Sequence, residues 1–254
     1  MLVTAATSRM DEALAFSSKF GFEFCSWDQL RKPSYEPTYI LNFGPERAEI
    51  LSHVLKGPGP VYVDFESAKS NHRRKFGGGR GEMLAKAIGL RKGIRALHIV
   101  DATAGLAQDA FLLATLGCRV RLFERNPVIY CLLKDGIRRG LASNAPEIVS
   151  AVRLFEHRFG SADFNDRADV AYLDPMFSKR DTRIQVNKEM TIFKNIVGSD
   201  ADGSNLLSKA LQSNVKRVVV KRPRLADDLA NVKPTHRIIG KSSRFDVYAR
   251  QALK

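Results

Sequence analysis

The chain has 254 residues, of which 44% are hydrophobic, and its 41 Lys and Arg residues outnumber 27 Asp and Glu residues, for a net charge of +14. This apolar content is sufficient for a buried core, which excludes a chain that is disordered as a whole. No run approaches the roughly 18 uncharged apolar residues of a membrane-spanning helix, and no secretory signal pattern opens the chain, so we expect a cytoplasmic protein with no membrane partner. The positive charge favours a polyanionic partner, with nucleic acid as the leading candidate.

The first part of the chain, residues 1–66, is predicted to be a small α+β subdomain. A strand-like run covers residues 2–5, and a helical pattern covers residues 8–20. Short extended runs follow, separated by turns that contain Pro and Gly, at residues 22–25, 39–43 and 61–65.

The next segment, residues 67–95, is predicted to be a basic, glycine-rich connection. Nine Lys or Arg residues stand against one Glu between positions 69 and 95, so more than half of the net charge lies there. Such cations neutralise phosphates, and glycines would let the backbone follow an irregular nucleic-acid surface, although a solvated loop without a partner is the alternative. The expected nucleic-acid-binding residues, here and further along the chain, are Arg73, Arg74, Lys75, Arg80, Lys179, Arg180 and Lys221.

The remaining residues, 96–254, alternate between strand and helix. Strands are predicted at residues 96–101, 119–123, 152–155, 169–173 and 217–221. Helices are predicted at residues 106–116, from Pro127 onward, at 187–197 and at 204–212, and a closing antiparallel pair at 236–239 and 244–249. Strands separated by helices are typical of an α/β fold with a mostly parallel sheet.

Three of the predicted strands end in a carboxylate, namely Asp101, Glu124 and Asp174. Parallel strands present such groups to a ligand that lies across their carboxyl ends. After Asp101, small residues and the single Gly105 indicate a sharp turn, which suits an amino-acid group and a sulfonium better than a pyrophosphate. Glu124 lies 19 residues past Gly105, where an acid commonly binds ribose hydroxyls, so dinucleotides and S-adenosylmethionine both stay open. An ordinary strand-to-helix turn and a surface ion pair of Glu124 are the structural alternatives.

The segment Asp174-Pro175-Met176-Phe177 is similar to the loop of amino-group methyltransferases. Its Asp174 carboxylate and Pro175 carbonyl would accept the two hydrogens of a planar amine and turn the nitrogen lone pair toward a methyl donor. Phe177 would stack on the base. An ordinary Asp-Pro turn is the alternative.

Several segments together resemble the bacterial ribosomal RNA small subunit methyltransferase J family, namely residues 72–82, 101–106, 122–127, 172–177, 218–223 and 244–248. The resemblance implies a class I methyltransferase fold, Rossmann-like, with a mostly parallel seven-stranded sheet and an antiparallel last strand. It implies methyl transfer from S-adenosylmethionine to the N2 amine of a guanosine in 16S rRNA, with free rRNA or the small ribosomal subunit as partner. The family pattern continues Gly-Leu with Gly-Arg-Asp, where this chain has Ala107-Gln108-Asp109.

The predicted site residues come from the turn after Asp101, from the acid Glu124 and from the family resemblance. The expected cofactor-binding residues are Asp101, Thr103, Gly105, Gln108, Asp109, Glu124, Arg125, Gly160, Ser161 and Asp174. The expected catalytic residues are Asp174, Pro175 and Phe177. No metal site is expected, because the three cysteines show no CxxC spacing and no histidine pair has metal-ligand spacing. A methyltransferase for DNA adenine or protein glutamine, and an RNA-binding assembly factor without catalysis, are the alternatives, and the oligomeric state stays open.

Overall fold

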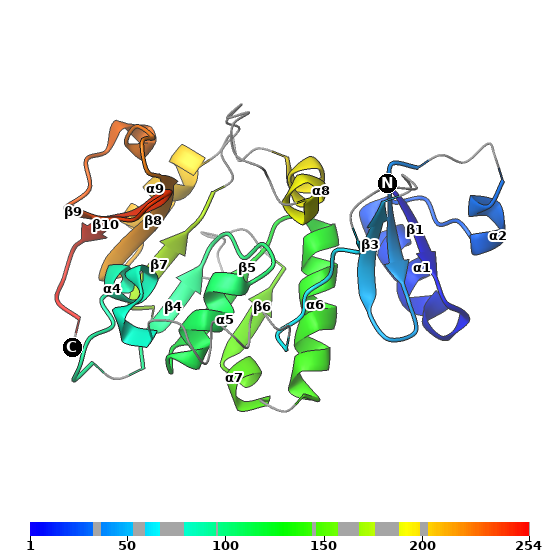
Figure 1. Ribbon diagram of the computed structural model, residues 1–254, viewed down its shortest axis with the longest axis horizontal. Helices are drawn as coiled ribbons and strands as arrows, with labels where there is room; N and C mark the ends of the chain where they lie inside the picture. The colour runs from blue at the N-terminus through cyan, green and yellow to red at the C-terminus, as the bar shows by residue number, and fades with distance from the viewer. Residues whose placement is uncertain are drawn as a thin grey trace. The chain divides into compact units, whose positions relative to one another are not determined.

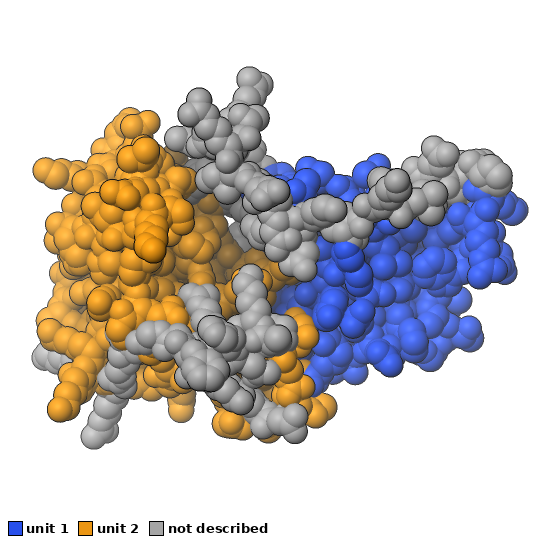
Figure 2. All heavy atoms as spheres, viewed as in Figure 1, with its two compact units in different colours: residues 1–63, 126–139, 179–198 blue, residues 64–125, 140–178, 199–254 orange. Residues whose placement is uncertain are grey.

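The structure is a computed structural model, and it describes residues 1–32, 37–52, 59–66, 79–94, 96–143, 146–156, 168–175, 188–198 and 203–253. Contacts within the chain form two compact units, which have different colours in Figure 2. The first unit comprises residues 1–63, 126–139 and 179–198, and the second comprises residues 64–125, 140–178 and 199–254. Each unit combines segments that are distant in sequence, so the predicted boundaries 1–66, 67–95 and 96–254 stay a prediction.

The second unit contains a seven-stranded sheet with the strand order β6-β5-β4-β7-β8-β10-β9 (Figure 1). The strands are β4 (His98–Asp101), β5 (Arg119–Phe123), β6 (Val152–Phe155), β7 (Val170–Leu173), β8 (Arg217–Pro223), β9 (His236–Ile239) and β10 (Ser243–Ala249). The five strands from β6 to β8 are parallel, whereas β10 is antiparallel to both of its neighbours. The predicted sheet, mostly parallel with an antiparallel last strand, is confirmed.

Helices cover both faces of this sheet. The helices of this unit are α4 (Met83–Ile88), α5 (Gln108–Thr115), α7 (Pro146–Ser150) and α9 (Gly203–Gln212), with the 3-10 turns η2 (Gly79–Gly81) and η4 (Leu229–Asn231). Tyr172 of β7 donates a hydrogen bond to Asp109 of α5, whereas the next residue, Leu173, packs in a cluster with Leu207 of α9. Because successive side chains of a strand point to opposite faces, α5 and α9 lie on opposite faces of the sheet.

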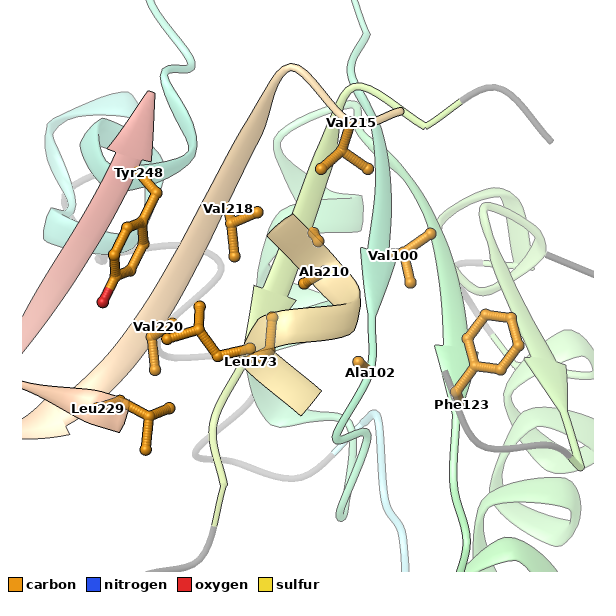
Figure 3. Close-up of a cluster of buried hydrophobic side chains, with 12 residues drawn as sticks. Val100, Ala102, Phe123, Leu173, Ala210, Val215, Val218, Val220, Leu229 and Tyr248 are labelled. Atoms are coloured by element: carbon orange, nitrogen blue, oxygen red, sulfur yellow. The ribbon is translucent and has the colours of Figure 1, made fainter. Parts of the chain in front are cut away.

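Figure 3 shows the core on the α9 face, where apolar side chains from several strands point toward one another. The valines of β8 are fully buried. Because a parallel sheet is covered on both faces, the sequence of this strand is a continuous apolar run rather than an alternating one. The labelled residues are Val100, Ala102, Phe123, Leu173, Ala210, Val215, Val218, Val220, Leu229 and Tyr248.

The first unit contains a three-stranded sheet formed by β1 (Leu2–Ala5), β2 (Tyr39–Phe43) and β3 (Ala48–Ser52). Its helices are α1 (Met10–Phe20), α2 (Trp27–Leu30), α8 (Lys188–Val197) and α6 (Pro127–Leu141), of which residues 140–141 belong to the second unit; η1 (Thr7–Arg9) precedes α1. Buried Asp135 of α6 forms ion pairs with Arg9 at 3.1 Å and with Arg139 at 2.8 Å. The ion pair with Arg9 joins α6 to the residue before α1, although the two are far apart in sequence, whereas the ion pair with Arg139 lies within α6.

The predicted elements differ from the structure mainly where elements are short. The predicted extended runs 22–25 and 61–65 form only isolated bridges, at Phe24 and Val61. The sequence reading did not anticipate β3, α2, α4 or α7, which have four to six residues each and so show too little periodicity. None of the described helices is long and apolar enough to cross a membrane.

Candidate active site

The turn between β4 and α5 lies at the carboxyl edge of the sheet and is held on both sides. Ala102 donates its N–H to the carbonyl of Tyr172 at 3.0 Å, and Ala104 donates its N–H to the carbonyl of Phe123 at 3.1 Å. The turn therefore continues the pairing of β4 with both neighbouring strands for a short distance beyond Asp101. This places the residues that follow Asp101 between the ends of β5 and β7.

Two residues of this turn have left-handed backbone conformations. Gly105 has a φ of 53° and Ala107 has a φ of 55°. The helix α5 consequently begins at Gln108, two residues later than the predicted start at Leu106. Glycine adopts this conformation without strain, but the Cβ of Ala107 carries a steric cost at a position where the family pattern has glycine.

The carboxylates of Asp101 and Glu124 bind the backbone of the turn. Asp101 is only 2% exposed, and its Oδ1 accepts the N–H of Thr103 at 3.0 Å and the hydroxyl of Thr103 at 3.4 Å. Glu124, also buried, accepts the N–H of Gly105 at 3.0 Å. These bonds fix the two acids against the turn on which we expect the cofactor to lie.

Lys221 of β8 links two further carboxylates at the same edge. Its ammonium group lies 2.7 Å from Oδ2 of Asp174 and 2.9 Å from Oδ2 of Asp109. The hydroxyl of Tyr172 donates to the same oxygen of Asp109 at 2.7 Å. In addition, the N–H of Asp174 donates to the hydroxyl oxygen of Thr103 at 2.7 Å. One continuous network therefore joins the β4–α5 turn to the residue that follows β7.

Burial and the proximity of these acids shift their pKa values. Burial raises the pKa of Asp101 to about 7, and the neighbouring Asp109, Asp174 and Glu124 add to the increase against the opposing hydrogen bond from Thr103. Loss of hydration also raises the pKa of Asp174, with Lys221 lowering it and Asp109 raising it. Burial alone would lower the pKa of Lys221, but Asp174 and Asp109 outweigh burial, so this pKa is raised and the ammonium stays charged.

The donor and acceptor groups at this edge suit a cationic ligand. Four carboxylates meet here, and one ammonium group bridges two of them, so a positively charged sulfonium and an amino group would find a favourable field. Glu124 is a carboxylate acceptor of the kind that binds hydroxyl groups of a ribose. These residues fit S-adenosylmethionine, and among the described residues no cluster of His, Cys, Asp or Glu has the arrangement of a metal site.

The structure brings most of the described predicted cofactor residues together. Asp101, Thr103, Gly105, Asp109, Glu124 and Asp174 all take part in the bonds given above. Gln108 is exposed at the start of α5, Arg125 is half-buried after Glu124, and Pro175 is buried. The following predicted residues lie outside the described residues: Arg73, Arg74, Lys75, Gly160, Ser161, Phe177, Lys179, Arg180 and the side chain of Arg80.

Two contributions were not anticipated from the sequence. Tyr172 was interpreted as part of an apolar strand, yet its hydroxyl binds Asp109; a tyrosine directly before the Leu173-Asp174 end of a buried strand is the signal that was available. Lys221 was expected to contact RNA, and the structure places its ammonium between Asp109 and Asp174. Its role toward RNA stays a prediction.

A sheet of this strand order, with an acidic turn after β4 and an Asp-Pro pair after β7, defines an S-adenosylmethionine-dependent methyltransferase of class I. A family model described as "Putative SAM-dependent methyltransferase" matches residues 25–250. A solved structure of a SAM-dependent methyltransferase from Neisseria gonorrhoeae is 30% identical, covers 98% of this chain and 96% of its own, and superposes with a TM-score of 0.72.

Curated relatives identify the family more closely. "Ribosomal RNA small subunit methyltransferase J" of Hahella chejuensis is 46% identical over 100% of this chain and 96% of the relative. The protein of the same name from Aeromonas salmonicida is 48% identical over 89% of this chain and 91% of the relative. The chain therefore belongs to the ribosomal RNA small subunit methyltransferase J family.

Proposed function

We propose that this chain transfers a methyl group from S-adenosylmethionine to the exocyclic N2 amine of a guanosine in the 16S rRNA of the small ribosomal subunit. The names of the relatives support a small-subunit rRNA substrate. The observation that carries the chemistry is the carboxylate of Asp174, which is 38% exposed at the carboxyl edge of the sheet and is held by Lys221 at 2.7 Å. Through the hydrogen bond of its N–H to Thr103, Asp174 joins the turn after Asp101 to the proposed acceptor loop, residues 174–177.

The cofactor residues act through charge and hydrogen bonding. S-adenosylmethionine, when bound, supplies a methyl group on a sulfonium that leaves as a neutral thioether. The Asp101 and Asp109 carboxylates would stabilise the positive charges of the cofactor, and Glu124 would accept hydrogen bonds from its ribose. Thr103, Gly105, Gln108 and Arg125, together with Gly160 and Ser161, would complete the binding surface.

The acceptor amine needs positioning, because its lone pair is delocalised into the purine ring and makes it a poor nucleophile. The Asp174 carboxylate and the Pro175 carbonyl would each accept one amine hydrogen and direct the lone pair toward the methyl group. Since Lys221 binds Oδ2 of Asp174, we assign Oδ1 to the amine. Phe177 would stack on the guanine.

Asp174 would also act as a proton acceptor after the bond between the methyl group and the nitrogen forms. The nitrogen gains a methyl group and must release one of its hydrogens as a proton. Partial loss of hydration raises the pKa of Asp174, which makes its carboxylate a better proton acceptor than a fully hydrated aspartate. The ion pair with Lys221 acts against this increase by lowering the pKa of Asp174, and so favours the ionised carboxylate before the reaction.

The RNA would be bound by cationic side chains of the chain. The basic segment 67–95 would neutralise phosphates, together with Lys179, Arg180 and Lys221. A guanosine must leave its stack to reach Asp174, so a loop or an exposed helix end is the expected target.

The test uses purified protein, labelled S-adenosylmethionine, and 16S rRNA, assembled small subunits or DNA. We expect label in the ribosomal substrates, at N2 of one guanine. Label in DNA or in protein alone would replace the proposed substrate with another planar amine. Absence of cofactor binding by calorimetry would favour an assembly factor.

Asp174→Ala tests the proposed role of the carboxylate. We expect kcat to fall by at least about 100-fold, on the order of the loss when one positioned polar group is removed from an active site. Asp169→Ala is the matched control: Asp169 directly precedes the same strand at its opposite end and also pairs with a lysine, so this variant loses a comparable ion pair away from the proposed site. Near-normal turnover of Asp174→Ala, with methylation by the control retained, would contradict the role.

A further inference from the structure

Leu225 is the most exposed of the large apolar side chains that the structure describes, with 88% of its surface accessible. It lies in the turn that follows β8, four residues beyond Lys221. Parallel β7 and β8 are in register at Leu173 and Val220, and the ion pair of Asp174 with Lys221 continues this register. Leu225 therefore lies beyond the same sheet edge as the acceptor carboxylate.

The turn around Leu225 is held by the guanidinium group of buried Arg244. Nη1 of Arg244, on β10, donates to the carbonyls on both sides of Leu225, at 3.1 Å to Arg224 and 2.5 Å to Ala226. Arg244 is itself fixed by two hydrogen bonds to buried Asp246, at 2.8 and 3.0 Å. The side chain of Leu225 is therefore exposed to solvent, on a turn whose backbone is fixed by hydrogen bonds from Arg244.

The segment after this turn packs beside the acceptor loop. Leu229 lies in the same core cluster as Val220 and Leu173, and Figure 3 shows the three side chains together. A Cβ added to Gly203 would lie 3.4 Å from Pro175 and 3.7 Å from Leu229, so both residues flank the start of α9. The segment that carries Leu225 is therefore anchored next to Pro175.

The charges near Leu225 favour an anionic partner. Arg224 is exposed next to it, and the N–H of Arg224 donates to the carbonyl of Ser242, which places exposed Lys241 at the neighbouring hairpin tip. Asp227 is an exposed acid in the same segment, whereas Asp228 forms ion pairs with Arg237 and Arg244. An apolar tip flanked by cations suits a nucleic acid better than it suits an apolar protein surface.

We propose that Leu225 is a wedge that inserts beside the target guanosine, disrupts its stacking and helps to deliver the base to Asp174. Apolar side chains, leucine among them, act in this way in proteins that unstack nucleic acids, and here the fixed backbone of the turn means that little order has to be gained on binding. This inference rests on the proposed function, because it requires an RNA substrate.

The test compares Leu225→Ala with Ile239→Ala, which removes another exposed apolar side chain, 60% accessible, from the outer strand β9. The target guanosine is first mapped with the wild-type enzyme. The substrate is an rRNA fragment that contains this guanosine, with the fluorescent base 2-aminopurine next to it to report unstacking. With S-adenosylhomocysteine present, we expect wild type and Ile239→Ala to increase the fluorescence on binding, and Leu225→Ala not to do so. We also expect kcat/KM of Leu225→Ala to fall by about tenfold or more.

The second substrate is the same fragment with abasic sites on both sides of the target, which removes the stacking that a wedge would have to disrupt. On it, the loss in Leu225→Ala should shrink to within about twofold of wild type. An equal loss on both fragments, or a wild-type fluorescence increase in Leu225→Ala, would overturn the proposal. A loss seen only with assembled subunits would assign Leu225 to a ribosomal protein instead. Failure of wild type to methylate any RNA would instead refute the proposed function.

Discussion

Asp101→Asn should remove the pH dependence of stability that this buried acid imposes. The amide keeps an oxygen that can accept the N–H of Thr103, so the turn retains its hydrogen bond at 3.0 Å. The amide cannot ionise, so it avoids the cost of a charge in a site that is 2% exposed and close to three other carboxylates. The substitution therefore changes charge with little change in shape.

The magnitude follows from the pKa of Asp101, which rises from 3.8 to about 7 on folding. The folded protein binds this proton more tightly than the unfolded chain, so stability is lost as the pH rises from about 4 to about 7. At about 1.36 kcal/mol per pH unit, this interval corresponds to about 4 kcal/mol. Asp101→Asn should be nearly as stable as wild type at pH 4, and more stable by up to about 4 kcal/mol above pH 7.

The assay is urea unfolding of the cofactor-free protein from pH 4 to pH 8. Asp169→Asn is the control of opposite sign: burial would raise the pKa of Asp169, but hydrogen bonds from Lys216 and from the N–H of His98 outweigh burial and lower it. That control should lose stability at neutral pH and approach wild type in acid. Parallel curves for wild type and Asp101→Asn would refute the reasoning, because they would mean that Asp101 does not titrate in this range.

Two further predictions concern the same edge of the sheet. Lys221→Met should raise the pKa of Asp174 and move the acid limb of kcat/KM to higher pH, whereas Lys221→Arg should restore the profile. An unchanged pH profile with a weaker salt dependence of RNA binding would show a phosphate contact instead. Ala107→Gly should stabilise the protein by about 0.5–1 kcal/mol and raise Tm by about 2 °C, because it relieves the left-handed conformation at φ 55°. Ala110→Gly, inside α5, is the control and should destabilise by about 1 kcal/mol; a lower Tm for Ala107→Gly would contradict the strain.

Much of both sheets could be predicted from the sequence because their strands are apolar runs bounded by turn residues or helical patterns. The limits of β1, β2 and β6 agree with the predicted residues, and those of β7 and β10 differ by one residue at one end. Short elements such as α2 and β3 could not be predicted, since polar residues, Asp28 and Gln29 in α2 and Glu49 in β3, interrupt the apolar run. The start of α5 was missed because the sequence does not report the sign of φ at Ala107.

The sequence by itself determined which kinds of group lie at the site. Asp101 ends β4, whereas Glu124 and Asp174 directly follow β5 and β7, and the common direction of parallel strands takes all three to one edge. Only the tertiary structure decided which of these groups touch. Asp174 and Lys221 are 47 residues apart and form an ion pair because β7 pairs with β8, and the same pairing brings Asp109 within reach of Lys221. Strand order depends on packing between distant segments, whereas periodicity and turn residues act over a few positions, so local sequence predicts the elements but not these contacts.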